Sequence, residues 1–152
     1  MRQYLVCNII LLFISILPHN GYCVEQSPEQ FVSEFYQWYF NADPGTTPAE
    51  RNDAIYNYVA KQTVDDIRSI KIGNSDIYKD TYYFTKVGSY TADWKSVKTI
   101  IHPAMAIGNK LYVINVTFDT GLKKNDVIVS LTKENGKFYI KSVMDVFPDI
   151  LE

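Results

Sequence analysis

The segment FVSEFYQWYF, Phe31 to Phe40, is the feature that most constrains the fold of this chain. Ser27 as N-cap, Pro28 at the first helical position and Gln30 completing a capping box predict that a helix begins here. The turn-forming run at 41–45 predicts its end. Large apolar side chains would cover more than half of the helix circumference, which is wider than a flat surface requires. We therefore expect this helix to lie in the hollow of a curved sheet.

The aromatic side chains of this helix could form either a core or a binding platform for sugar, lipid or base. Leaving four such rings in water would forgo on the order of 10 kcal/mol, at roughly 25 cal/mol per Å² and 150–250 Å² for each ring. We therefore predict a core. The apolar face comprises Phe31, Val32, Phe35, Trp38 and Tyr39, with Tyr36 and Phe40 beside it.

The rest of the first half is also predicted to be helical. Thr47 and Glu50 repeat the capping signature, and Ile55, Tyr58, Val59 and Gln62 follow at helical spacing. A further short helix is predicted to start at 63–66.

The second half changes to a period of two residues, which indicates β-strands. Pro103 interrupts the first strand-like run and predicts an edge position or a bulge. Asn135 and Gly136 form the dipeptide that favours a tight hairpin. Helices followed by an antiparallel meander predict an α+β fold, with the N-terminal helices packed on one face of the sheet. The strand-like runs are 97–107, 111–119, 126–133 and 137–147.

The N-terminus has the pattern of a secretory signal peptide. Arg2 precedes the apolar run 4–17, which is shorter than the roughly 20 residues that span a bilayer. We predict a cleaved segment at 1–23 and a single domain at 24–152, exported to a bacterial periplasm. A retained membrane anchor is the alternative. The bulky Tyr22 argues against lipid modification of Cys23.

Composition limits the chemistry that the predicted mature chain can perform. Both cysteines, Cys7 and Cys23, fall in the predicted signal segment, so disulfides, a thiol nucleophile and thiolate metal ligands are excluded from the mature chain. The mature chain carries a formal net charge of −3, which does not suggest nucleic-acid binding. We expect no metal and no cofactor.

Catalytic constellations are sparse in the sequence. A Ser–His–Asp triad would require His102, which we interpret as a structural or surface residue before a proline. Asp65 and Asp66 are adjacent, so on a helix they would point about 100° apart. A hydrolase that uses carboxylates such as Asp93 or Asp145 stays open as a third option behind two kinds of binding protein.

The segment from Ile77 to Trp94 is rich in tyrosine and shows no regular period. Tyrosine combines a large contact area with a polar tip, which suits protein interfaces. The alternative is that several rings, Phe84 and Trp94 above all, pack into the core. The residues proposed to contact a partner are Tyr78, Tyr82, Tyr83, Tyr90 and Asp93.

Several stretches give the chain a family resemblance. They are the FYQWYF helix, DTYYFTKVGSYTADWKSVKT, the NVTF strand and VSLTKENGKFYIKSV. In this order the chain resembles the bacterial family known as domain of unknown function 3828, small exported proteins of Gram-negative bacteria. Phe138 stands where that family usually has tryptophan. The resemblance implies a cystatin-like, nuclear-transport-factor-like cone and no established catalytic residues. It also suggests a role among immunity proteins that neutralise toxins delivered by neighbouring cells.

The favoured interpretation is a non-enzymatic periplasmic binding protein, an immunity protein that binds and neutralises a secreted antibacterial effector. Its partner would be a protein, and no stable membrane anchor is expected after signal cleavage. The alternative is a periplasmic carrier or envelope factor that holds a small ligand in an apolar pocket under the sheet.

Overall fold

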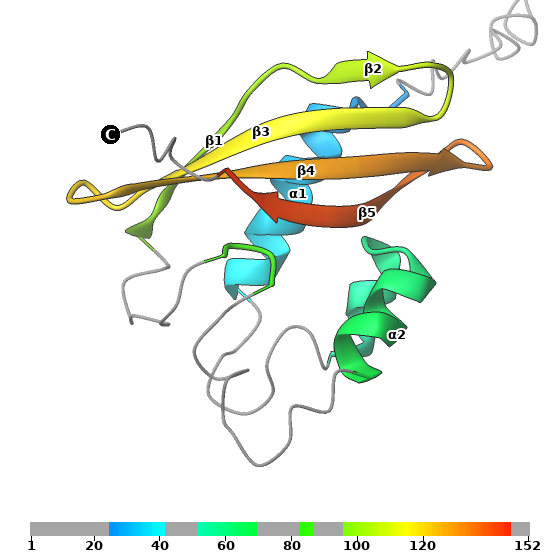
Figure 1. The fold of residues 1–152 in the computed structure, drawn as a ribbon, viewed down its shortest axis with the longest axis horizontal. Helices are drawn as coiled ribbons and strands as arrows, with labels where there is room; N and C mark the ends of the chain where they lie inside the picture. The colour runs from blue at the N-terminus through cyan, green and yellow to red at the C-terminus, as the bar shows by residue number, and fades with distance from the viewer. Residues whose placement is uncertain (1–24, 42–51, 70–82, 87–95, 147–152) are drawn as a thin grey trace, which may run out of the picture.

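The computed structural model describes residues 25–41, 52–69, 83–86 and 96–146. The helix at 28–41 crosses one face of a curved, five-stranded antiparallel sheet, and the helix at 61–69 lies beside one edge of that sheet (Figure 1), which confirms the predicted α+β class. The predicted signal segment and its cleavage site lie outside the described residues. Among the residues described, no helix is long and apolar enough to cross a membrane.

Helix α1, Pro28–Asn41, begins where the capping signature predicts. The Ser27 hydroxyl oxygen accepts from the Gln30 backbone N–H at 3.1 Å, which satisfies one of the donors that a helix start leaves unpaired. The reciprocal half of the predicted capping box is wrong, because no hydrogen bond joins the Ser27 backbone N–H to the Gln30 side-chain oxygen in the described structure; the Gln30 amide N–H donates to Glu34 at 3.2 Å. The N-cap alone therefore defines the start of α1.

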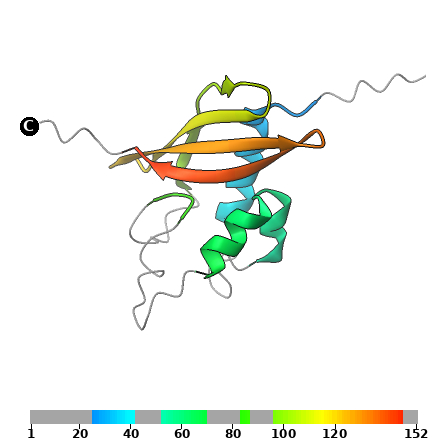
Figure 2. The same cartoon turned by 45° about the vertical axis from the view of Figure 1, so that its right-hand side comes forward.

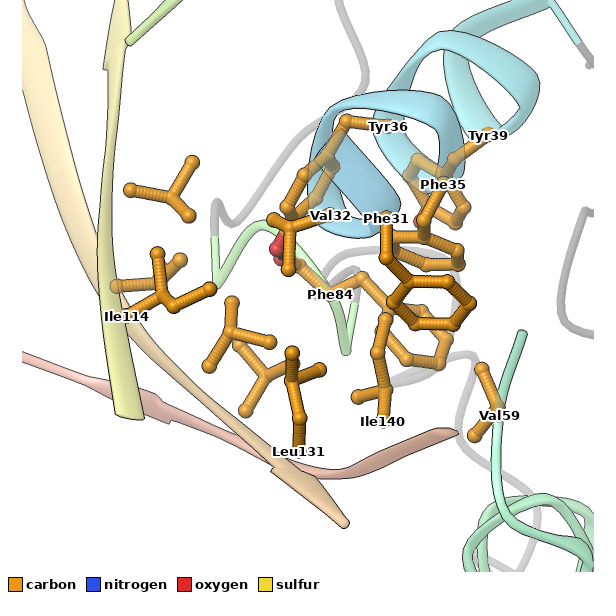
Figure 3. Packing of buried hydrophobic residues seen from close by; sticks show 14 of the residues in the cluster. Phe31, Val32, Phe35, Tyr36, Tyr39, Val59, Phe84, Ile114, Leu131 and Ile140 are labelled. Atoms are coloured by element: carbon orange, nitrogen blue, oxygen red, sulfur yellow. Dashed lines mark hydrogen bonds between the residues drawn. The ribbon is translucent and has the colours of Figure 1, made fainter. Parts of the chain in front are cut away.

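The aromatic face of α1 forms the core of the protein, as predicted (Figure 3). Tyr36 is completely buried, although the sequence places it beside the apolar face. Trp38, by contrast, is only half-buried and stacks on Tyr58 with ring centroids 5.2 Å apart. The binding-platform alternative is wrong for the buried members of this face, which are Phe31, Val32, Phe35, Tyr36 and Tyr39.

The second helical region differs from its prediction. A 3₁₀ helix η3, Asp53–Asn57, has Asn52 as its N-cap, and helix α2 spans Lys61–Ser69. The intervening Val59 is not helical but bridges to Ile140 in a parallel pairing. The backbone pairing with the sheet overrides the helical spacing of the sequence, and α2 starts two residues before Thr63 as a result. The predicted cap at Thr47 and Glu50 lies outside the described residues.

The sheet has strand order β1-β3-β4-β5, and β2 pairs with β3 on the same side as β1. Pro103 divides the first strand-like run into β1 and β2, both at the edge, so the edge prediction is confirmed. The strands are β1 Lys98–Ile101, β2 Met105–Ile107, β3 Leu111–Asp119, β4 Lys124–Glu134 and β5 Lys137–Asp145.

The predictions for the last hairpin and for the buried face of the sheet also agree with the structure. Asn135 and Gly136 have positive φ angles of 51° and 81°, as the predicted tight turn requires. A register shift near Ser130 and Leu131 leaves Lys141 as an extra residue in β5. The side chains that face α1 are buried: Ile114, Val116, Phe118, Val127, Val129, Leu131, Phe138, Ile140 and Val143.

Candidate protein-interaction site

The turn Tyr83–Lys86 is the part of the tyrosine-rich segment that the structure describes. Its Phe84 side chain is completely buried and packs edge-to-face on Phe35 and Tyr39, with ring centroids 5.0 and 5.5 Å away. Figure 3 shows Phe84 between α1 and the sheet. The prediction that Phe84 belongs to the core is confirmed, and this ring fixes the turn to the domain.

Two side chains from distant elements hold the backbone of the turn. The Tyr36 hydroxyl donates to the Phe84 carbonyl at 2.8 Å, and the Asn125 amide donates to the Thr85 carbonyl at 2.7 Å. Burial raises the pKa of Tyr36 well above its usual range, so this phenol stays a neutral donor. Helix α1 and strand β4 thus determine where the turn lies.

Strain and an unpaired hydroxyl distinguish this turn from an ordinary connection. Lys86 has a φ of +54°, a conformation that side chains other than glycine adopt at a cost. The buried Thr85 hydroxyl has no hydrogen-bond partner among the described residues. A backbone held in such a conformation by Phe84, Tyr36 and Asn125 is consistent with selection for the groups that it presents.

The turn presents an aromatic ring paired with a cation. The Lys86 ammonium lies 4.1 Å from the centroid of the half-buried Tyr83 ring. Burial lowers the pKa of Lys86, and the nearby Asp145 carboxylate opposes that shift. A tyrosine and a partly desolvated lysine on a rigid turn can contact an aromatic or acidic group of a protein partner.

Of the predicted partner-contact residues, only Tyr83 lies within the described residues. Tyr78, Tyr82, Tyr90 and Asp93 lie outside them, so their grouping with Tyr83 stays a prediction. Lys86 and Asn125 were not among the predicted contact residues. No local signal connects Asn125 with Thr85, since the two residues are 40 positions apart.

The residues considered for catalysis are arranged differently from an active site. The Thr117 hydroxyl donates to Asp126, so the His102 Nε2–H donates to Thr117 over 3.0 Å. The hydroxyl therefore stands in the middle, whereas a nucleophilic triad has the imidazole there. In the described part of the chain, no group of three or more His, Cys, Asp or Glu residues is placed to hold a metal ion. Asp93 lies outside that part.

A small groove lies between α1 and the edge of the sheet. Its volume is about 270 Å³, and Ser33, Gln37 and Asn41 form one wall. Val97 and Thr99 form the opposite wall. This groove is not the apolar pocket expected for a ligand carrier, because α1 and Phe84 fill the apolar hollow under the sheet.

No protein-family model matches the chain, and no curated protein is significantly similar to it in sequence. The resemblance to domain of unknown function 3828 therefore stays a prediction.

Two solved structures share the fold, and both are of the type VI effector–immunity complex Tae3–Tai3 from Ralstonia pickettii. In the native complex, the similar chain has a TM-score of 0.65 and 24% identity, over 80% of this chain and 97% of that chain. In the selenomethionine form, the TM-score is 0.65 and the identity 26%, over 80% of this chain and 98% of that chain. The shared architecture thus extends over nearly all of the similar chain.

Proposed function

We propose that this chain is a periplasmic immunity protein, which neutralises a secreted type VI effector by binding it. The observation that carries the proposal is the likeness to a chain of the Tae3–Tai3 complex over almost its whole length. The rigid Tyr83–Lys86 turn supports it independently, because the fold fixes the backbone of this turn while leaving Tyr83 half-buried. Cleavage of the signal segment at 1–23 would release the chain into the periplasm.

The mechanism would be steric and non-enzymatic. A fixed turn with an aromatic ring and a cation can fill or cover the active-site cleft of an effector without any chemical step. The affinity would come from a few buried anchors, which are often aromatic, surrounded by contacts that exclude water. The family resemblance supports the same role, since it implies a small exported protein without established catalytic residues.

The test begins with capture of the effector. The chain 24–152 serves as bait in a lysate from its own organism that contains the exported toxins, and the protein that survives a salt wash is identified. That effector is then purified and assayed with and without the bait. The proposal predicts a stoichiometric complex in which the effector is inactive. A captured effector that stays fully active would contradict it.

A matched pair of variants locates the binding site. Tyr83→Ala/Lys86→Ala removes the ring and the cation of the turn. Tyr139→Ala/Lys137→Ala removes a similar pair on β5, where the lysine ammonium lies 5.2 Å from the ring centroid. The first variant should weaken the complex at least tenfold and the second by less than twofold, with both folds intact. Equal affinities would exclude the turn from the interface.

The carrier alternative has less support, because ring and aliphatic side chains fill the hollow beneath the sheet. Native mass spectrometry of the purified chain would revive it by detecting a stoichiometric lipid.

A further inference from the structure

In the part of the chain that the structure describes, no strand pairs with the outer side of β1, and the register identifies the backbone groups on that side. The His102 backbone N–H donates to the Asn115 carbonyl at 3.0 Å, which makes these residues a hydrogen-bonded pair of the ladder. Such pairs alternate along antiparallel strands, so Ile100 opposite Thr117 is also hydrogen-bonded. Thr99 and Ile101 lie at the positions between, and their N–H and C=O groups therefore point away from β3.

The backbone at Pro103 and Ala104 differs from the backbone at Thr99 and Ile101 in its hydrogen bonding. Pro103 has no N–H, and the Ala104 N–H donates to the Glu29 carboxylate at 2.8 Å. This hydrogen bond is the main reason why the pKa of Glu29 is lowered. In the described part of the chain, by contrast, no backbone hydrogen bond reaches Thr99 or Ile101 from outside the sheet. An open edge is a template for strand pairing.

The groove beside α1 borders this edge at Thr99. Ser33, Gln37 and Asn41 of α1 add polar groups to its lining, no lining side chain is charged, and the remaining lining residues are Tyr36, Phe40 and Val97. The volume of about 270 Å³ is slightly below the roughly 300–1,000 Å³ of pockets for drug-sized molecules. A neutral side chain with hydrogen-bonding groups suits these walls.

We propose that the open edge of β1 is a strand-addition site. An extended segment of a protein partner pairs its backbone with Thr99 and Ile101, and one of its neutral side chains enters the groove beside α1. Free groups that recur every second residue, roughly 6.6 Å apart, match an extended chain. In this mode the backbone bonds supply affinity and the groove supplies selectivity. Only the identity of the partner, the effector, rests on the function proposed above.

Hydrogen exchange of the free protein is the first test. The amides of Thr99 and Ile101 should exchange rapidly, while the amide of Ile100, which is bonded within the ladder, should be protected. Slow exchange at Thr99 and Ile101 would show that the chain itself already covers the edge, and the proposal would be overturned.

A displayed library of random peptides tests strand addition without the effector. Peptides selected on the wild-type chain should protect the amides of Thr99 and Ile101 when bound. Thr99→Pro removes an N–H that the ladder does not use, so it should keep the fold and weaken these peptides about tenfold or more. Thr99→Val keeps the N–H and should weaken them by only a few-fold. A library without binders that protect these amides would overturn the proposal, whether or not Thr99→Pro folds.

The captured effector separates this proposal from the proposed function. An inhibited effector whose binding leaves Thr99 and Ile101 unprotected would refute strand addition and leave the immunity role standing. Peptides that protect both amides, together with a captured effector that stays active, would refute the immunity role and leave strand addition standing.

Discussion

The two edges of the sheet differ in how their backbone groups are paired within the described residues. At β5, the backbone of 58–60 pairs with Ile140: Ala60 N–H donates to the Ile140 carbonyl at 2.9 Å, and Ile140 N–H donates to the Tyr58 carbonyl at 2.8 Å. Figure 2 shows α2 beside this edge. At the other edge, the Ala104 N–H between β1 and β2 donates to the Glu29 carboxylate, and no backbone partner outside the sheet reaches Thr99 or Ile101 from the residues that the structure describes. The chain thus pairs its own backbone with β5 at Ile140 and, within the described residues, provides no such pairing for β1.

The Tyr83–Lys86 turn repeats this contrast within four residues. Phe84 is buried in the core, whereas Lys86 keeps a positive φ angle and lies over the half-buried Tyr83 ring. A positive φ at lysine does not favour folding. Stability thus explains the buried and paired regions of this fold, whereas we attribute its unpaired or strained regions to function.

The largest effect on stability is expected at the β5 edge. Ile140 is completely buried, so Ile140→Ala should lower the free energy of unfolding by about 2–5 kcal/mol. Ile101→Ala at the open edge should cost less than half as much, because Ile101 is half-buried. Urea denaturation of both variants checks the comparison, and equal losses would contradict the difference in side-chain burial between the two edges.

Removing a single hydrogen bond at the β5 edge should have an intermediate effect on stability. The Thr63 hydroxyl donates to the carbonyl of the bulge residue Lys141 at 2.7 Å. Thr63→Val keeps the shape but removes this donor, and should cost about 1 kcal/mol in thermal or urea unfolding. Thr63→Ser keeps the hydroxyl and should recover part of the loss. If Thr63→Val were as stable as wild type and Thr63→Ser were less stable, packing of the side chain rather than the hydrogen bond would hold α2 to β5.

The strained turn should separate stability from binding. Because glycine adopts a positive φ freely, Lys86→Gly should leave the free energy of unfolding unchanged or raise it by up to ~1 kcal/mol. Lys137→Gly, in a strand, should instead lower it by about 0.5–1 kcal/mol. The Lys86 variant should nevertheless bind the effector more weakly. A clear loss of stability in Lys86→Gly would show that the lysine serves the fold.

The smallest effect should come from the capped part of the β1 edge and should depend on pH. The pKa of Glu29 is lowered in the folded chain, mainly by the Ala104 N–H, so its contribution to stability is present above the ordinary value of 4.5. That contribution is lost as the pH falls through the lower folded pKa. The stability difference between wild type and Glu29→Gln should therefore shrink below pH 4.5. A difference that is independent of pH would contradict this role.

Local patterns predicted the parts of the fold that local chemistry determines. Ser27 and Pro28 predicted the start of α1, and Asn135–Gly136 predicted the last hairpin. The closure of the β5 edge could not be predicted, because Val59 and Ile140 are 81 positions apart and their pairing replaces a helical pattern. Of the site, the sequence predicted only a tyrosine-rich segment, because the hydrogen bonds that hold its backbone come from the distant Tyr36 and Asn125.

A titration of the captured effector with the chain 24–152 is the decisive experiment for the proposed immunity role. Effector activity is followed against the molar ratio of the two proteins, with Tyr83→Ala/Lys86→Ala and Tyr139→Ala/Lys137→Ala as the matched comparison. We predict that activity falls to zero at a stoichiometric ratio for wild type and for the β5 variant, and that the turn variant requires a large excess. Full effector activity at saturating wild-type chain would contradict the account.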